Sequence, residues 1–334
     1  MELLQIVSKQ NNSEILEISH SQTVHQRLSS SSSFIEANTV ESSLEEIKEN
    51  HIIPVFIKDN EPLISHADFI KTTWKVVNDM FPDERILKPN IRLSHPVKGR
   101  IPEAKDKPAI QLQDHERTIY YERMAFIIEI PSISDTIGGN EVCLSIGGVK
   151  AYSADNLYSK KGTIEHFKIF VGFQNKVCTN LCVWSDGASL DLKVTSLGSL
   201  MVAIRTMIEG YNKNHHLFHL KDFCNYSLTE KEFATLIGRC RMYNHLPSEQ
   251  KVEVPPLLFG DTQIGSICKD YYKDNSFCKD ELGNINLWKL YNLFTGANKS
   301  SYIDSFAERS ISAFSFIYSI KQTLQNHTYN WYLN

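Results

Sequence analysis

The stretch that decides the fold is Thr118-Ile-Tyr-Tyr-Glu-Arg-Met-Ala-Phe-Ile-Ile-Glu-Ile130. Its side chains alternate with a period of two, which is the spacing of a β-strand. One face carries Tyr120, Met124, Phe126, Ile128 and Ile130, and the other carries Tyr121, Arg123 and Glu129. This alternation predicts a strand with one face on the core and one face in solvent.

Further strands are expected after this one. Gly138-Gly139-Asn140 predicts a tight turn into a strand at residues 142–149. Strands at 166–173 and 177–184 follow, joined by a short turn at Gln174-Asn175, and Asp186-Gly187 predicts another turn before a strand at 190–195. The sequence therefore predicts a meander of antiparallel strands.

The residues before the meander carry weaker signals. Residues 1–50 are poor in aromatic side chains and contain the run Ser29–Ser33, so we expect a loosely ordered N-terminal lead-in with a short helix at 43–50. Residues 51–57 predict an edge strand, and Ser65 predicts the cap of a helix that ends before Pro82. Prolines recur between residues 82 and 108, which leaves room only for a short strand at 91–94.

From Leu197 onward, apolar residues recur at the spacing of α-helices rather than at that of strands. Thr229-x-x-Glu232 predicts a capping box, and residues 303–324 predict the longest helix. Strands followed by helices favour an α+β fold, with an antiparallel strand meander in the N-terminal half and a helical C-terminal half. We expect a strand-rich region at 51–196 and a helix-rich region at 197–334, packed on the sheet as one domain.

Composition points to a globular protein that needs no disulfides. The chain has 334 residues, of which 42% are hydrophobic and 22% charged, and its seven cysteines are scattered. Neither a basic-then-apolar leader nor an apolar stretch long enough for a membrane helix is apparent. These observations predict a cytoplasmic protein with no membrane contact.

Charge is unevenly distributed along the chain. The net charge is −4, yet residues 85–107 contain seven Lys and Arg against two acids, a local charge of +5. Cations in this segment alternate with apolar residues or proline. Shortly after the segment come an aromatic residue, Tyr121, and another cation, Arg123. The hypothesis is a surface that contacts nucleic-acid phosphates and stacks a base, formed by Arg92, His95, Lys98, Arg100, Tyr121 and Arg123.

Two other groups of residues bear on metal binding. Cys178 and Cys182, if both lie on one strand, stand about 13 Å apart, which is too far for one zinc ion. His215 and His219 would share a helix face as a workable ligand pair, with Asp222 as a possible third ligand. No recognisable spacing completes the set, so the sequence predicts no metal and no cofactor.

Several stretches resemble a bacterial family of domains of unknown function, family 3871. They are residues 94–102 (SHPVKGRIP), 120–124 (YYERM) and 170–182 (FVGFQNKVCTNLC). Residues 290–295 (LYNLFT) and Arg309 are similar to the broader phage/plasmid-like protein group, although Leu293 stands where that group has alanine. The resemblance implies a setting in mobile elements, and it implies no established activity or catalytic residue.

Three functions remain as hypotheses. The first is a non-enzymatic protein of mobile elements that binds DNA or RNA through the basic segment. The second is an enzyme with a pocket near the His215–His219 turn, which is disfavoured because no common catalytic motif is present. The third is a scaffold or regulator that binds another protein, and it predicts an exposed apolar patch without a basic groove.

Overall fold

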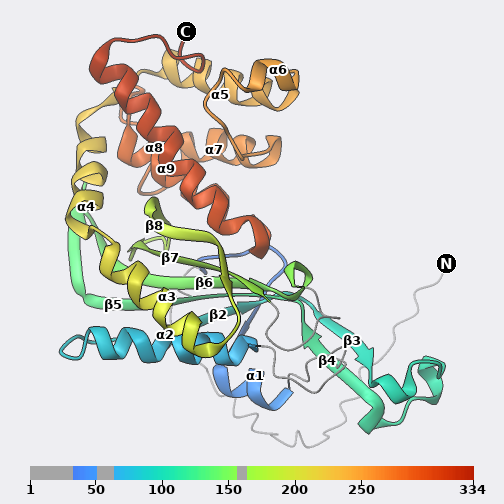
Figure 1. Ribbon diagram of the computed structural model, residues 1–334. Coiled ribbons are helices and arrows are strands. Elements are labelled where there is room, and N and C mark those ends of the chain that lie inside the picture. The colour runs from blue at the N-terminus through green and yellow to red at the C-terminus, as the bar shows by residue number, and fades with distance from the viewer. Residues whose placement is uncertain (1–32, 51–63, 156–163) are drawn as a thin grey trace, which may run out of the picture. The chain divides into compact units, whose positions relative to one another are not determined.

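The computed structural model describes residues 33–50, 64–155 and 164–334 (Figure 1). Residues 32–334 form one compact unit. Residues 1–32 of the lead-in expected at 1–50, and the edge strand expected at 51–57, lie outside the described residues. The described part of the lead-in, residues 33–50, contains a short strand and a short helix. Within them, no helix is both long and apolar enough to cross a membrane.

An antiparallel sheet forms the centre of the fold. Its strand order is β1-β2-β5-β6-β7-β8, and the last four strands follow one another in the chain as a meander. The strands are β1 (Val40–Ser42), β2 (Asn90–Leu93), β5 (Arg123–Ile137), β6 (Asn140–Ala151), β7 (Glu165–Asn175) and β8 (Leu181–Val194). The helices are concentrated in the C-terminal part, which confirms the α+β class.

Both faces of the sheet are covered around β5. Phe126 and Ile128 belong to the main core, whereas Ala125 and Ile127 point the other way into a second buried cluster. The expectation of one solvated face was therefore wrong for this part of the sheet. The reason is tertiary, because apolar residues from both ends of the chain, such as Phe34 and Phe306, supply the second cluster.

Helices pack on opposite sides of the sheet (Figure 1). Helices α2 (His66–Met80) and α3 (Leu197–Gly210) pack against each other beneath it, and the long helix α9 (Ile303–Asn326) lies against the other side. Ser65 caps α2 by accepting a hydrogen bond from the Asp68 backbone N–H at 3.1 Å. The short helix expected near residues 43–50 is α1 (Leu44–Asn50), so that prediction is confirmed.

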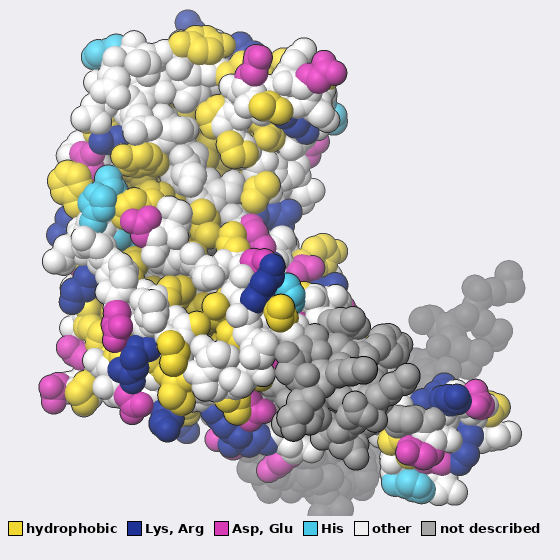
Figure 2. Space-filling model, viewed as in Figure 1, with side chains coloured by type: hydrophobic (Ala, Val, Ile, Leu, Met, Phe, Trp, Pro, Cys, Tyr) yellow, Lys and Arg dark blue, Asp and Glu magenta, His cyan; other side chains and the backbone are white. Residues whose placement is uncertain are grey.

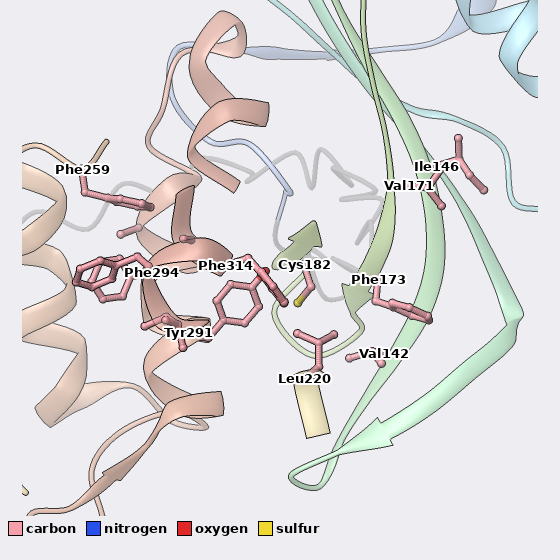
Figure 3. Packing of buried hydrophobic residues seen from close by; sticks show 14 of the residues in the cluster. Val142, Ile146, Val171, Phe173, Cys182, Leu220, Phe259, Tyr291, Phe294 and Phe314 are labelled. Atoms are coloured by element: carbon pink, nitrogen blue, oxygen red, sulfur yellow. The ribbon is translucent and has the colours of Figure 1, made fainter. Parts of the chain in front are cut away.

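The remaining helices extend the core away from the sheet. They are α4 (Lys213–Asp222), α5 (Glu230–His245), α6 (Ser248–Lys251), α7 (Asp261–Lys273) and α8 (Leu287–Asn298), with a small ladder of β9 (Ser227–Leu228) and β10 (Ile285–Asn286). The predicted capping box of α5 forms, since Thr229 Oγ1 accepts from the Glu232 N–H. One cluster of buried side chains runs from Phe173 on β7 through Phe314 on α9 to Phe259 (Figure 3).

Strand β8 differs from the prediction. It continues through Asp186-Gly187, where a turn was expected, although its pairing with β7 shifts between Val183 and Ala188, and it begins at Leu181 rather than at Val177. A Cβ at Gly187 would lie 2.2 Å from the Val171 carbonyl oxygen, so this glycine permits close strand approach and does not form a turn. Cys178 lies in the preceding turn, which means that it and Cys182 do not share a strand.

A two-stranded arm leaves the sheet between β2 and β5. The strand expected at 118–130 is split at Glu122, and its first part is β4 (Arg117–Tyr121), paired with β3 (Pro96–Arg100). The intervening residues form three single turns of 3₁₀ helix, Pro102–Ala104, Ala109–Gln111 and Asp114–Glu116. Figure 1 shows the arm extending beyond the sheet, with these turns at its tip.

Candidate nucleic-acid interface

The pairing of the arm decides which side chains share a surface. Residues directly opposite each other in an antiparallel pair lie on the same face of the ribbon. Lys98 is opposite Ile119, and Arg100 is opposite Arg117. Lys98, Arg100 and Arg117 therefore lie on one face, which we call the cationic ribbon face. The other face carries Val97, Gly99 and Tyr120 and no charged side chain from β3.

Two cations directly opposite each other repel, so the pair at Arg100 and Arg117 has a local cost. Each guanidinium has a partner near the tip. Arg100 Nη1 donates to the Lys107 carbonyl, and Arg117 Nη1 lies 3.3 Å from Asp114 Oδ1. Arg117 and Asp114 are both largely exposed, so this ion pair is screened and weak.

The tip of the arm carries acids as well as cations. Residues 96–121 contain five Lys and Arg and four Asp and Glu, so the arm as a whole has a net charge of +1. Figure 2 shows both kinds of side chain together at its far end. Lys107 is bound to the buried Glu116, and this ammonium lowers the pKa of the Glu116 carboxyl. Lys107 is therefore neutralised within the tip, and the other cations of the arm are the exposed Lys105 and the three on the cationic ribbon face.

Arg92 lies apart from the ribbon. It is on β2, where its guanidinium donates to Thr39 Oγ1 and to the Thr39 carbonyl, both at 3.0 Å. Glu41 Oε2 lies 3.9 Å away, and the Arg92 side chain is only 13% exposed. This residue joins β1 to the sheet, and little of it is accessible to a phosphate.

His95 and Arg123 meet at the root of the arm. They line a pocket of about 260 Å³ together with residues from the N-terminal segment and from the start of α9. Arg123 Nε lies 3.4 Å from Asp304 Oδ2, and a second nitrogen lies 3.7 Å from Glu122 Oε1. His95 is exposed. Two carboxylates thus offset the charge of Arg123, which weakens its attraction for a phosphate.

Tyr121 lies on the cationic ribbon face by register, at the end nearest the sheet. Its ring is half-buried and packs against the main core, and its carbonyl accepts a hydrogen bond from His66 Nε2 at 2.8 Å. Tyr121 is therefore anchored at the root, which leaves only part of its ring available for stacking.

Only some of the residues predicted to form one nucleic-acid surface lie together in the structure. The structure brings Lys98 and Arg100 together, places His95 and Arg123 in a neighbouring pocket, and separates Arg92 from both. Arg117 was missed, because only the pairing of β3 with β4 shows that it shares a face with Arg100. The expected strand started one residue after it, so a longer strand would have included it.

The histidine cluster belongs to a different part of the fold. His215, His216 and His219 are on helix α4, and all three rings contact Trp184 of β8. Across the residues that the structure describes, no group of three or more His, Cys, Asp or Glu side chains is placed to hold a metal ion.

Comparison with known proteins identifies a family but no activity. Residues 17–333 match the family described as "Domain of unknown function, B. Theta Gene description (DUF3871)". No curated protein and no solved structure matches the chain. The match spans nearly the whole sequence, and the chain therefore belongs to the DUF3871 family.

Proposed function

We propose that this protein binds nucleic acid through the arm formed by β3 and β4. The observation that carries the proposal is the strand register, which places Lys98, Arg100 and Arg117 on one face of a projecting ribbon. Side-chain cations on one face are what backbone phosphates require. A two-stranded ribbon is also narrow enough to enter the major groove of DNA, which is about 12 Å wide.

The size of the ribbon limits the strength of this contact. Five paired residues span about 17 Å, enough for a few consecutive phosphates. Three neutralised phosphates predict a slope of log Kobs against log salt of about −2.7 on duplex DNA and about −2.1 on a single strand. We therefore expect weak binding without sequence preference, easily observed at low ionic strength and lost at high salt.

The test is fluorescence anisotropy with labelled single- and double-stranded oligonucleotides, titrated at several salt concentrations. The double substitution Lys98→Gln and Arg100→Gln should weaken binding and reduce the slope on duplex DNA by about 1.8. The control is Arg85→Gln with Lys88→Gln, which removes two exposed cations of the same basic segment outside the ribbon. This control should retain the wild-type slope.

Two results would count against the proposal. One is the absence of binding by wild-type protein at low salt. The other is an equal loss of binding in the ribbon variant and the control, which would mean that general charge attracts the oligonucleotide. Because Arg100 donates to the Lys107 carbonyl, circular dichroism should first establish that the ribbon variant keeps the wild-type melting profile.

We propose a role in mobile elements only because the sequence resembles the phage/plasmid-like protein group. Similarity of residues 290–295 and Arg309 to the phage/plasmid-like group supports a role in mobile elements, and a cytoplasmic location accords with nucleic-acid binding. Neither follows from the geometry of the arm. Gene-neighbourhood analysis of the family would test the first, since phage or plasmid genes should flank its members.

Binding of another protein is the second candidate. The arm exposes apolar side chains, with Ile110 at the tip 92% exposed, Ile119 41% and Val97 36%. Exposed apolar residues on a projecting element are typical of protein contacts. If oligonucleotides fail to bind, light scattering of wild type and Ile110→Asp would be the next measurement, because self-association through the tip should be lost in that variant.

A further inference from the structure

Helix α4 brings two imidazole nitrogens face to face. His215 and His219 are four residues apart on this helix and therefore project from one side of it. Their Nε2 atoms lie 3.1 Å apart, and their ring centroids are 4.5 Å apart. The start of the helix is fixed next to them, because Asn212 Oδ1 accepts a hydrogen bond from the His215 N–H at 3.0 Å.

Aromatic side chains hold both rings in place. Trp184 of β8 packs edge-on against His215 and His219, at centroid distances of 4.9 and 5.1 Å. Tyr318 of α9 packs against His219 at 5.0 Å. His219 is buried and His215 is exposed, and Figure 2 shows histidine side chains at the surface over α4. The pair is therefore preorganised by packing, with one side open to solvent.

We propose that His215 and His219 form a two-nitrogen binding site for a late first-row transition metal ion of the Zn²⁺, Cu²⁺ or Ni²⁺ class. Imidazole nitrogen suits these ions. Metal–nitrogen distances of about 2.0–2.1 Å, applied to two nitrogens 3.1 Å apart, give an angle at the metal of roughly 100°. That angle lies between those of square-planar and tetrahedral coordination, so the separation of the two nitrogens suits one shared metal ion.

The rest of the coordination shell comes from solvent. Among the described residues, no third His, Cys, Asp or Glu completes a metal site here. Asp222, the third ligand that the sequence suggested, is held by Lys321 Nζ at 2.6 Å and by Asn225 at 3.1 Å.

Metal binding replaces an existing proton. In the absence of metal one of the two Nε2 atoms carries a hydrogen and donates it to the other. For both nitrogens to bind a cation, that ring must place its proton on Nδ1 instead. The exchange changes the tautomer of one ring with no net loss of a proton from the pair. With metal bound, the Nδ1–H of His219 is buried and has no hydrogen-bond partner among the described residues, which lowers the affinity of the site.

Calorimetric titration of the full chain with NiCl₂ tests the proposal. His215→Ala should weaken binding by at least about tenfold, since loss of even an orienting partner costs 10–100-fold in metal affinity. The matched control is His245→Ala, which removes an exposed histidine at the end of α5. It should leave the affinity unchanged. Equal affinity of wild type and His215→Ala, or no binding by wild type at millimolar Ni²⁺, would overturn the site.

Electron paramagnetic resonance of the wild-type protein with one equivalent of Cu²⁺ gives a second readout that needs no variant. Coupling to two nitrogens is the expected spectrum, and it separates this site from binding at the partly exposed cysteines. A spectrum with sulfur or oxygen ligands and no nitrogen coupling would refute the proposal. The result is independent of nucleic-acid binding, because α4 contributes nothing to the arm.

Discussion

Replacing Lys150 with methionine should destabilise the protein more than an ordinary core substitution. The Lys150 side chain is fully buried on β6, with its Nζ 2.9 Å from Asp155 Oδ2 and 2.8 Å from Glu165 Oε2. The ammonium also lies 3.9 Å from the centre of the Phe167 ring. Methionine fills a similar volume but leaves two buried carboxylates without this cation.

The size of the expected loss in the free energy of unfolding follows from the desolvation of those two carboxylates. Removing one partner from a buried ion pair costs about 3–5 kcal/mol, because the remaining charge is neither solvated nor paired. A typical domain has only about 5–15 kcal/mol of stability, so this loss is a large fraction. The carboxylates also fix the backbone, since Asp155 accepts from the His166 N–H at 2.7 Å and Glu165 from the Ile64 N–H at 3.0 Å.

A triple variant separates charge from packing. Lys150→Met with Asp155→Asn and Glu165→Gln removes every charge of the group but retains oxygens that accept the two backbone hydrogen bonds. We expect it to recover most of the lost stability. Guanidinium unfolding, followed by both circular dichroism and tryptophan fluorescence, measures each variant. If the free energy of unfolding of the Lys150→Met variant were within about 1 kcal/mol of the wild-type value, the argument from desolvation would be refuted.

Three further substitutions test the packing of the sheet and of α2. Ser65→Ala should cost about 1 kcal/mol in a urea melt, because it removes the acceptor for the Asp68 N–H. Gly148→Ala should cost about 1–3 kcal/mol in the same melt, since the added Cβ would lie 2.4 Å from the buried Phe69 ring. Burial raises the pKa of Glu129, so its contribution to stability is present at acid pH and lost as the pH rises through that pKa. Glu129→Gln should therefore be more stable than wild type at pH 8, and this gain should shrink toward pH 4 in urea melts at both values.

Local signals in the sequence account for most of the elements. Ser65 and the proline at 82 bound α2, and the Thr229–Glu232 capping box begins α5 where expected. The Gly138-Gly139 turn connects β5 to β6, with positive φ at both glycines. Each of these features depends on residues within a few positions of one another, which is why the sequence alone reveals them.

Features that depend on distant residues escaped prediction. Gly187 looks like a turn residue, but it is needed because the Val171 carbonyl of the neighbouring strand approaches closely. The cations of the basic segment appear free in sequence, whereas Arg123 lies beside Asp304 from the far end of the chain. Arg117 shares a face with Arg100 only through strand pairing. Tertiary contacts therefore decide which predicted site residues remain accessible.

Excision of the arm is the most direct test of the proposed nucleic-acid binding. The arm leaves the sheet where the Ser94 N–H donates to the Arg123 carbonyl at 2.9 Å, so its root is closed by hydrogen bonds. Replacing residues 97–120 with an Asn-Gly turn keeps the Pro96–Tyr121 pair and the contact of Tyr121 with the core. In low-salt anisotropy titrations the excised protein should lose oligonucleotide binding, while wild type binds with a slope of about −2.7 on duplex DNA. Binding by the excised protein with wild-type affinity and slope would show that the arm is not the interface.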